Sequence, residues 1–203
     1  MRTAVLAGCV LALAVARVGA QCPGDLNGDG AVSIDEIVTA VKNSLLGCPA
    51  PGRRFVDNGD GTVTDSQNGL MWEKLSFDLT VHGVQNMYTW FSASTTKIAA
   101  LNSGRFAGYS DWRLPTIYEL QSLIDYDQSN PATNAAFNNA CVVNCRVATC
   151  SCTDIFHGPY WSSTDYAFNP SLAWGVVFGA GGGFVGPTEK TVFGDVRAVR
   201  NGS

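Results

Sequence analysis

Glycine-containing turns divide much of this chain into short apolar segments, and this punctuation constrains its fold more than any other feature. The chain has 22 glycines among 203 residues, or about 11%, well above the usual glycine content of ~7%. Asn-Gly and Asp-Gly steps at 58–61 separate the apolar segments 55–56 and 62–64, and an Asn-Gly step at 68–69 precedes 70–72. Such steps favour tight hairpin turns. We therefore expect a meander of short antiparallel strands here and not a helical bundle.

Two segments carry a helical pattern. Apolar residues recur at roughly helical spacing from Thr89 to Asn102. Further along, Thr116 and Glu119 form a capping box directly after Pro115. The apolar residues that follow this box share one helical face; they are Ile117, Leu120, Leu123 and Ile124. We expect one helix in each segment.

The C-terminal part has the pattern of strands. The segments 173–178 and 184–185 flank the glycine-rich stretch 179–183, which predicts a hairpin. A final strand is expected from Thr191 to Arg200. Two helices among short antiparallel strands define an α+β domain.

The N-terminus has the features of a signal peptide. Arg2 precedes an unbroken small-apolar stretch from Ala4 to Ala16, and small residues follow at 18–20. This stretch is shorter than the roughly 20 residues that span a bilayer. We expect residues 1–20 to be removed and the chain to be secreted, to the extracellular space, the periplasm or the cell surface. A lipid anchor on Cys9 is the alternative, because the residues before it resemble a lipobox.

Residues 25–36 match a calcium-binding loop at every specified position. Calcium takes six to eight oxygen ligands, which alternate residues of such a loop supply around a turn glycine. The expected ligands are the side chains of Asp25, Asn27, Asp29, Ser33 (through a water) and Glu36, and the carbonyl of Ala31. An Asn-Gly-Asp-Gly turn with incidental acids is the alternative interpretation. The loop resembles the EF-hand and the single dockerin-type repeats of exported bacterial proteins.

A small unit at 21–48 follows from this loop. Apolar residues at Ile34, Ile37, Val38, Val41 and Leu45 mark one face of a helix after the loop. Cys22 and Cys48 bound the unit, and a bridge between them would stabilise so short a piece jointly with calcium. A full dockerin has two repeats, so a cohesin partner is not expected. The linker 49–53 is rich in proline and glycine, and 54–203 forms the larger domain.

Four further cysteines fall within twelve residues. They are Cys141, Cys145, Cys150 and Cys152. Their spacing does not match the common zinc patterns, and export favours oxidation, so disulfides are expected. Cys150 and Cys152 should pair outward with Cys141 and Cys145, in an order that the spacing leaves open. Four thiolates around zinc are the alternative.

Charge and motifs limit the function classes. The formal net charge is −4, and loss of residues 1–20 would leave 11 basic and 17 acidic residues. No basic block is present, so a nucleic-acid or anionic-membrane partner is not expected. His82 and His157 are the two histidines, and no common hydrolase or nucleotide-binding motif occurs. We expect no enzyme, with a weak carboxylate-pair hydrolase as an alternative.

Six motifs follow one another along the larger domain and point to a known family. They are Asp57–Asp65, Gly69–Trp72, Gly108–Thr116, Glu119-Leu120, Tyr160–Thr164 and Val196–Arg200. Together, from about residue 54 to 200, they resemble the Lcl C-terminal domain family, long a domain of unknown function. The resemblance implies a C-type-lectin-like fold and extracellular ligand binding. The Glu-Pro-Asn and Trp-Asn-Asp motifs, with which sugar-binding C-type lectins ligate calcium, are absent.

The expected function is therefore a secreted, non-catalytic binding module, adhesin-like, with a structural calcium site. The adhesin that gives the family its name recognises sulfated glycosaminoglycans, which makes a sulfated polysaccharide the family-derived ligand. A neutral glycan or a surface protein is the alternative, because the chain is acidic. Convergence of Arg53, Arg54, Arg105 and Arg113 on one face, or a homo-oligomer, would favour the sulfated ligand. A structural envelope protein without a glycan ligand is a further alternative.

Overall fold

The structure is a computed structural model that describes residues 34, 37–38, 41, 53–179 and 183–202. The expected signal peptide, the calcium ligands and Cys22 and Cys48 all lie outside these residues. Ile34, Ile37, Val38 and Val41 have helical backbone, and their side chains are exposed. The larger of the two units into which the chain divides runs from Arg53 to Ser203.

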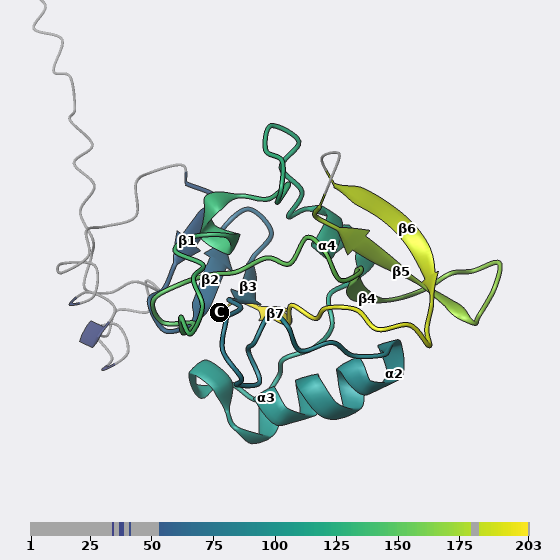
Figure 1. Cartoon of the computed structure of the whole chain (residues 1–203). Coiled ribbons are helices and arrows are strands. Elements are labelled where there is room, and N and C mark those ends of the chain that lie inside the picture. Colours follow the sequence, from purple (N-terminus) through teal and green to yellow (C-terminus); the bar gives the residue numbers. More distant parts are fainter. Residues whose placement is uncertain (1–33, 35–36, 39–40, 42–52, 180–182, 203) are drawn as a thin grey trace, which may run out of the picture. The chain divides into compact units, whose positions relative to one another are not determined.

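The first sheet of the larger unit is the expected meander, completed by the end of the chain (Figure 1). Its strand order is β1-β2-β3-β7, and all pairs are antiparallel. The strands are β1 (Phe55–Asp57), β2 (Thr62–Asp65), β3 (Leu70–Glu73) and β7 (Val199–Asn201). Gly59, Gly61 and Gly69 all have positive φ, as the turns between the first three strands require.

The second sheet is a three-stranded antiparallel meander in the order β4-β5-β6. Its strands are β4 (Tyr160–Asp165), β5 (Leu172–Val177) and β6 (Phe184–Glu189). The predicted glycine-rich hairpin is confirmed, since β5 and β6 pair from Leu172 and Glu189 to Val177 and Phe184.

Both predicted helices form, but the first has a π-helical centre, and the second ends at Gln121, before Leu123 and Ile124. Thr89 caps a continuous helical segment whose centre is π-helical: α2 (Trp90–Ser92), η1 (Ala93–Ile98) and α3 (Ala99–Ser103). The capping box of Thr116 and Glu119 is complete at the start of α4 (Ile117–Gln121). Short 3-10 turns are η2 (Phe106–Gly108) and η3 (Ala135–Phe137). The two sheets with these short helices agree with the α+β class.

Two apolar clusters form the core. One joins the first sheet, α4 and Phe137 with Tyr160 and Val176 of the second sheet. The other packs Ala93, Ile98 and Leu101 of the long helical segment against Trp112, Trp161 and Val196. Trp72, Trp112 and Trp161 are buried and Trp174 is partly buried, so core packing is the role of most of these rings.

The predicted final strand is wrong over most of its length. Only Val199–Asn201 is a strand, while 191–198 makes isolated bridges, such as Gly194 with Tyr88 and Asp195 with Tyr160. Figure 1 shows this segment passing from the second sheet to the first. A segment that crosses from one sheet to the other cannot form a continuous row of strand-pairing hydrogen bonds with either sheet along the crossing.

Asp111 and Arg113, on either side of Trp112, each form an ion pair with a residue remote from Trp112. Arg113 donates two hydrogen bonds to Glu119 at 2.8 and 2.7 Å, and Asp111 instead accepts two from Arg200. The backbone of Arg113 bridges Val199. The side chain of Arg113 thereby reaches the capping box of α4, which local spacing did not reveal.

Among the described residues, no helix has the length and apolar character needed to cross a bilayer.

Candidate ligand-binding groove

A closed loop follows α4 and borders a hollow in the larger unit. Leu123 is buried directly after the helix, and Ile124 bridges Thr133. The amide of Asp125 donates to the carbonyl of Ala132 at 3.1 Å. These contacts close residues 125–132 into a loop whose ends are held by the core.

Two open pockets adjoin this loop and share Asp125 and Asn134 in their linings; we call them together the loop groove. Their volumes are about 290 and 340 Å³, near the lower end of the ~300–1,000 Å³ typical of ligand sites. The first pocket is lined by Arg54, Phe55, Ser122, Leu123, Ile124, Asp125, Tyr126, Asp127 and Asn134, and the second by Asp125, Gln128, Ser129, Asn130, Pro131, Thr133, Asn134, Ala135 and Asn138.

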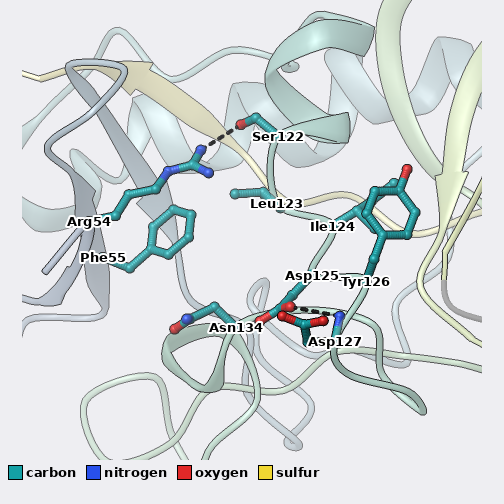
Figure 2. Close-up of a pocket in the computed structure, with 9 residues that line it drawn as sticks. All are labelled: Arg54, Phe55, Ser122, Leu123, Ile124, Asp125, Tyr126, Asp127 and Asn134. Carbon is teal, nitrogen blue, oxygen red and sulfur yellow. Dashed lines mark hydrogen bonds between the residues drawn. The ribbon is translucent and has the colours of Figure 1, made fainter.

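A turn at Asp125 presents an aromatic ring and a second acid to the first pocket. The Asp125 carboxylate accepts a hydrogen bond from the amide of Asp127 at 3.1 Å. Tyr126 at the tip of this turn is 71% exposed. Figure 2 shows its ring on the opposite side of the pocket from Arg54 and Phe55. The groove therefore combines an exposed ring with carboxylate and amide groups.

Arg54, the one cation among the lining residues, is already engaged. Its guanidinium donates two hydrogen bonds to Asp65, at 3.0 and 2.8 Å, and one to Ser122 at 3.0 Å. Burial alone would raise the pKa of Asp65, but hydrogen bonds from Arg54 and Asn68 outweigh it and hold that pKa below its usual value. The pair is therefore ionised at neutral pH, and Arg54 adds no net positive charge to the groove.

The other arginines considered for an anionic ligand do not join Arg54 there. Arg113 is held by Glu119, and Arg105 donates to the carbonyl of Gly108. Neither they nor Arg53 line the loop groove. With Asp125 and Asp127 in its lining, the groove repels sulfate groups. Its chemistry suits a ligand with hydroxyl groups and an apolar ring face.

Apart from Arg54, the sequence did not single out the groove residues. Their signal was an aromatic residue between two acids, Asp125-Tyr126-Asp127, directly after the predicted helix. The partners across the groove are remote in sequence: Arg54 was a candidate only as a basic residue, and Asn134 carried no signal of its own.

The four clustered cysteines form two disulfides. Cys141 pairs with Cys152, and Cys145 pairs with Cys150, so disulfide bonding in this segment is confirmed. Cys145, Cys150 and Cys152 have sulfurs within 4.8 Å of one another, but disulfide sulfurs supply no thiolate to zinc.

The two histidines have acidic partners outside the groove. His82 hydrogen-bonds the buried Glu73 at 2.7 Å, and His157 bonds Asp154 at 2.5 Å. Carboxylate-pair hydrolysis needs one acid shielded from water so that it stays protonated. In the groove, Asp127 is exposed and Asp125 is partly exposed.

The structure thus defines the class of protein as an α+β domain with two small sheets and an open polar groove. The family model described as the Lcl C-terminal domain matches residues 61–200, well over half of the chain. The chain therefore belongs to the Lcl C-terminal domain family. No curated protein matches it.

Proposed function

We propose that this chain is a secreted, non-catalytic binding module that recognises an uncharged extracellular glycan through the loop groove. One observation carries the proposal: the exposed ring of Tyr126 stands beside Asp125, Asp127 and Asn134, while Arg54 is neutralised by Asp65. Aromatic rings stack on the apolar faces of sugars, and carboxylates and amides accept and donate hydrogen bonds to hydroxyl groups. The ligand would be neutral because a sulfated chain meets two carboxylates in this groove.

A glycan array, run with calcium and with a chelator and including sulfated polysaccharides, identifies the ligand. Selective binding of neutral glycans supports the proposal. A blank array in both conditions overturns it and favours a protein partner or a structural envelope role.

Substitutions in the groove then test the site. We expect Tyr126→Ala to weaken glycan binding about tenfold, which corresponds to ~1.4 kcal/mol, because the stacking ring is removed. Tyr118→Ala is the matched control, since Tyr118 is 82% exposed on α4 and does not line the groove. Titration calorimetry with the best array glycan measures both affinities. Equal effects of the two substitutions would place the site elsewhere.

Asp127→Asn separates a neutral ligand from a sulfated one. Removal of this negative charge weakens a hydrogen bond to a sugar hydroxyl but strengthens binding of a sulfated chain. Undiminished binding of the neutral glycan by Asp127→Asn, or tighter binding of a sulfated glycosaminoglycan than of any neutral glycan by the parent, would contradict the neutral-ligand proposal.

We also propose a C-type-lectin-like fold for the larger domain and a structural calcium site in the small unit. The six ordered motifs support the first, and the match of residues 25–36 to a calcium loop supports the second. The proposed ligands are Asp25, Asn27, Asp29, Ala31, Ser33 and Glu36. The apolar stretch after Arg2 supports secretion.

Calcium titration tests the small unit. We expect Asp25→Ala to abolish calcium binding or weaken it at least tenfold, because the first loop ligand is lost. Asp60→Ala is the matched control: it lies in the similar motif 56–61, but its carboxylate accepts hydrogen bonds from Thr62 in the hairpin turn. Calorimetry with calcium chloride is the measurement. Unchanged binding by Asp25→Ala, or its loss in Asp60→Ala, would refute the assignment.

A further inference from the structure

The two disulfides of the cysteine cluster are unequally accessible. Cys141 is exposed, whereas its partner Cys152 is completely buried, and Cys145 and Cys150 are buried as well. Thiol–disulfide exchange begins with attack by a thiolate on one sulfur of a disulfide, and access decides which sulfur is attacked. A thiol from solution therefore reaches this cluster at Cys141.

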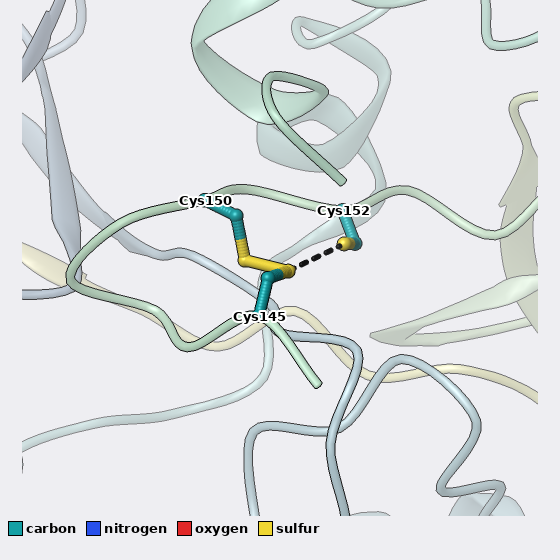
Figure 3. Close-up of side chains that lie close together, drawn as sticks. All are labelled: Cys145, Cys150 and Cys152. Atoms are coloured by element: carbon teal, nitrogen blue, oxygen red, sulfur yellow. Dashed lines mark hydrogen bonds between the residues drawn. A yellow bond between two sulfur atoms is a disulfide. The ribbon is translucent and has the colours of Figure 1, made fainter. Parts of the chain in front are cut away.

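The sulfur that such an attack releases lies beside the second disulfide. The sulfurs of Cys152 and Cys145 are 3.7 Å apart although they are not bonded to each other (Figure 3). Cys145 is bonded to Cys150. A thiolate on Cys152 thus has a disulfide sulfur in contact with it without any displacement of the backbone.

Cys150, the partner of Cys145, already faces a hydrogen-bond acceptor. The sulfur of Cys150 lies 3.2 Å from the carbonyl oxygen of Arg146, with the geometry of a thiol donating to that oxygen. Cys150 is 1% exposed. A thiol formed on Cys150 would therefore be satisfied inside the protein and shielded from reagents in solution.

We propose that these four cysteines form an exchange relay through which Cys141 takes up an external thiol as a stable mixed disulfide. The incoming thiolate attacks the sulfur of Cys141, the Cys141–Cys152 bond breaks, and the electron pair leaves on Cys152. The Cys152 thiolate attacks Cys145, the Cys145–Cys150 bond breaks, and Cys150 takes the proton that the incoming thiol lost. One thiol and two disulfides enter the reaction, and one thiol and two disulfides leave it.

The relay makes the attachment durable. In an isolated disulfide, the released thiolate returns to the mixed disulfide and expels the incoming group. Here Cys152 becomes bonded to Cys145 and is no longer a free thiolate. The thiol that remains is on Cys150, which is buried, and not beside the mixed disulfide on the exposed Cys141. The site is thus suited to hold a thiol compound covalently at the surface, independently of the loop groove.

Peptide mapping of the oxidised protein after incubation with reduced glutathione at mildly alkaline pH tests the relay. The sample is acid-quenched, unfolded, alkylated without reductant and digested. We expect glutathione on Cys141, a Cys145–Cys152 cross-link and the alkyl group on Cys150. Alkylation of Cys152 with the Cys145–Cys150 bond intact, or no glutathione on Cys141, would overturn the proposal.

A second arm replaces glutathione with a folded protein that carries one surface cysteine. An adduct with glutathione alone means that the site takes small thiols; an adduct with both means that it also takes protein thiols, and either result supports the relay. The variant Cys145→Ser/Cys150→Ser keeps the Cys141–Cys152 bond but lacks the acceptor disulfide. We expect its yield of adduct at Cys141 to fall several-fold, and an undiminished yield would contradict the relay.

Discussion

Replacement of Glu73 by alanine is expected to cost about 3–5 kcal/mol of unfolding free energy, because it leaves a buried lysine without its counter-ion. Glu73 is completely buried at the end of β3. Its carboxylate accepts hydrogen bonds from Lys97 at 2.5 Å and from the amide of Ala198 at 3.1 Å, and it bonds His82 at 2.7 Å. Denaturant unfolding at pH 7 measures the loss, which is a large share of the ~5–15 kcal/mol that holds a domain folded.

Two comparisons test whether the cost of Glu73→Ala comes from the burial of its ion pair or from the loss of any ion pair. Asp111→Ala removes the partner of Arg200 at a site where Asp111 is 57% exposed, and this change should cost less than about 1 kcal/mol. The double variant Glu73→Leu/Lys97→Met removes both buried charges and should recover part of the loss. An equal cost of Glu73→Ala and Asp111→Ala would contradict the assignment.

The second large effect is a loss of stability with rising pH that depends on Asp195. Burial, reinforced by the charge of Asp154, raises the pKa of Asp195 to about 8, although Arg197 and Lys97 act to lower it. Neither of its carboxylate oxygens has a hydrogen-bond partner among the described residues. Tyr160, which is also buried, bridges the backbone of Asp195. The folded protein therefore holds this acid protonated.

The direction of the pH dependence follows from proton binding. Between the ordinary aspartate pKa of 3.8 and about 8, the unfolded chain has lost the proton of Asp195 while the folded chain keeps it. This group therefore lowers the free energy of unfolding by up to about 1.4 kcal/mol per pH unit across that window. Glu73 acts in the opposite direction. Burial would raise its pKa, but Lys97 and His82 outweigh burial and lower it. The ionised Glu73 therefore contributes stability above pH 4.5, and this contribution is lost as the pH falls further.

Asp195→Asn isolates the effect, because asparagine resembles the protonated acid in shape but does not ionise. We expect the variant to lose much less stability than the parent between pH 5 and pH 8, as measured by denaturant unfolding at each pH. Asp127→Asn, at an exposed position, should follow the parent. A variant at Asp195 with the parent's pH dependence would refute the assignment of a buried protonated acid.

The sequence by itself determined the elements that short-range interactions specify. The turns at Gly59, Gly61 and Gly69 need positive φ, the capping box of Thr116 and Glu119 joins neighbours, and the β5–β6 hairpin closes over a short glycine-rich stretch. Each depends on residues close together in the chain, so local patterns predict it. The Lcl C-terminal motifs likewise run in register along the sequence and were recognisable there.

The tertiary structure alone decided the groove, the disulfide pairing and the buried charges. Arg54 meets Ser122 across 68 residues, and Glu73 meets the amide of Ala198 across 125. The path of 191–198 between the sheets and the pairing of Arg113 with Glu119 and not with Asp111 depend on the same long-range packing. The free energy of these long-range contacts is set by burial among segments that are remote in sequence. Spacing and periodicity describe only neighbours along the chain, so no local pattern records such contacts.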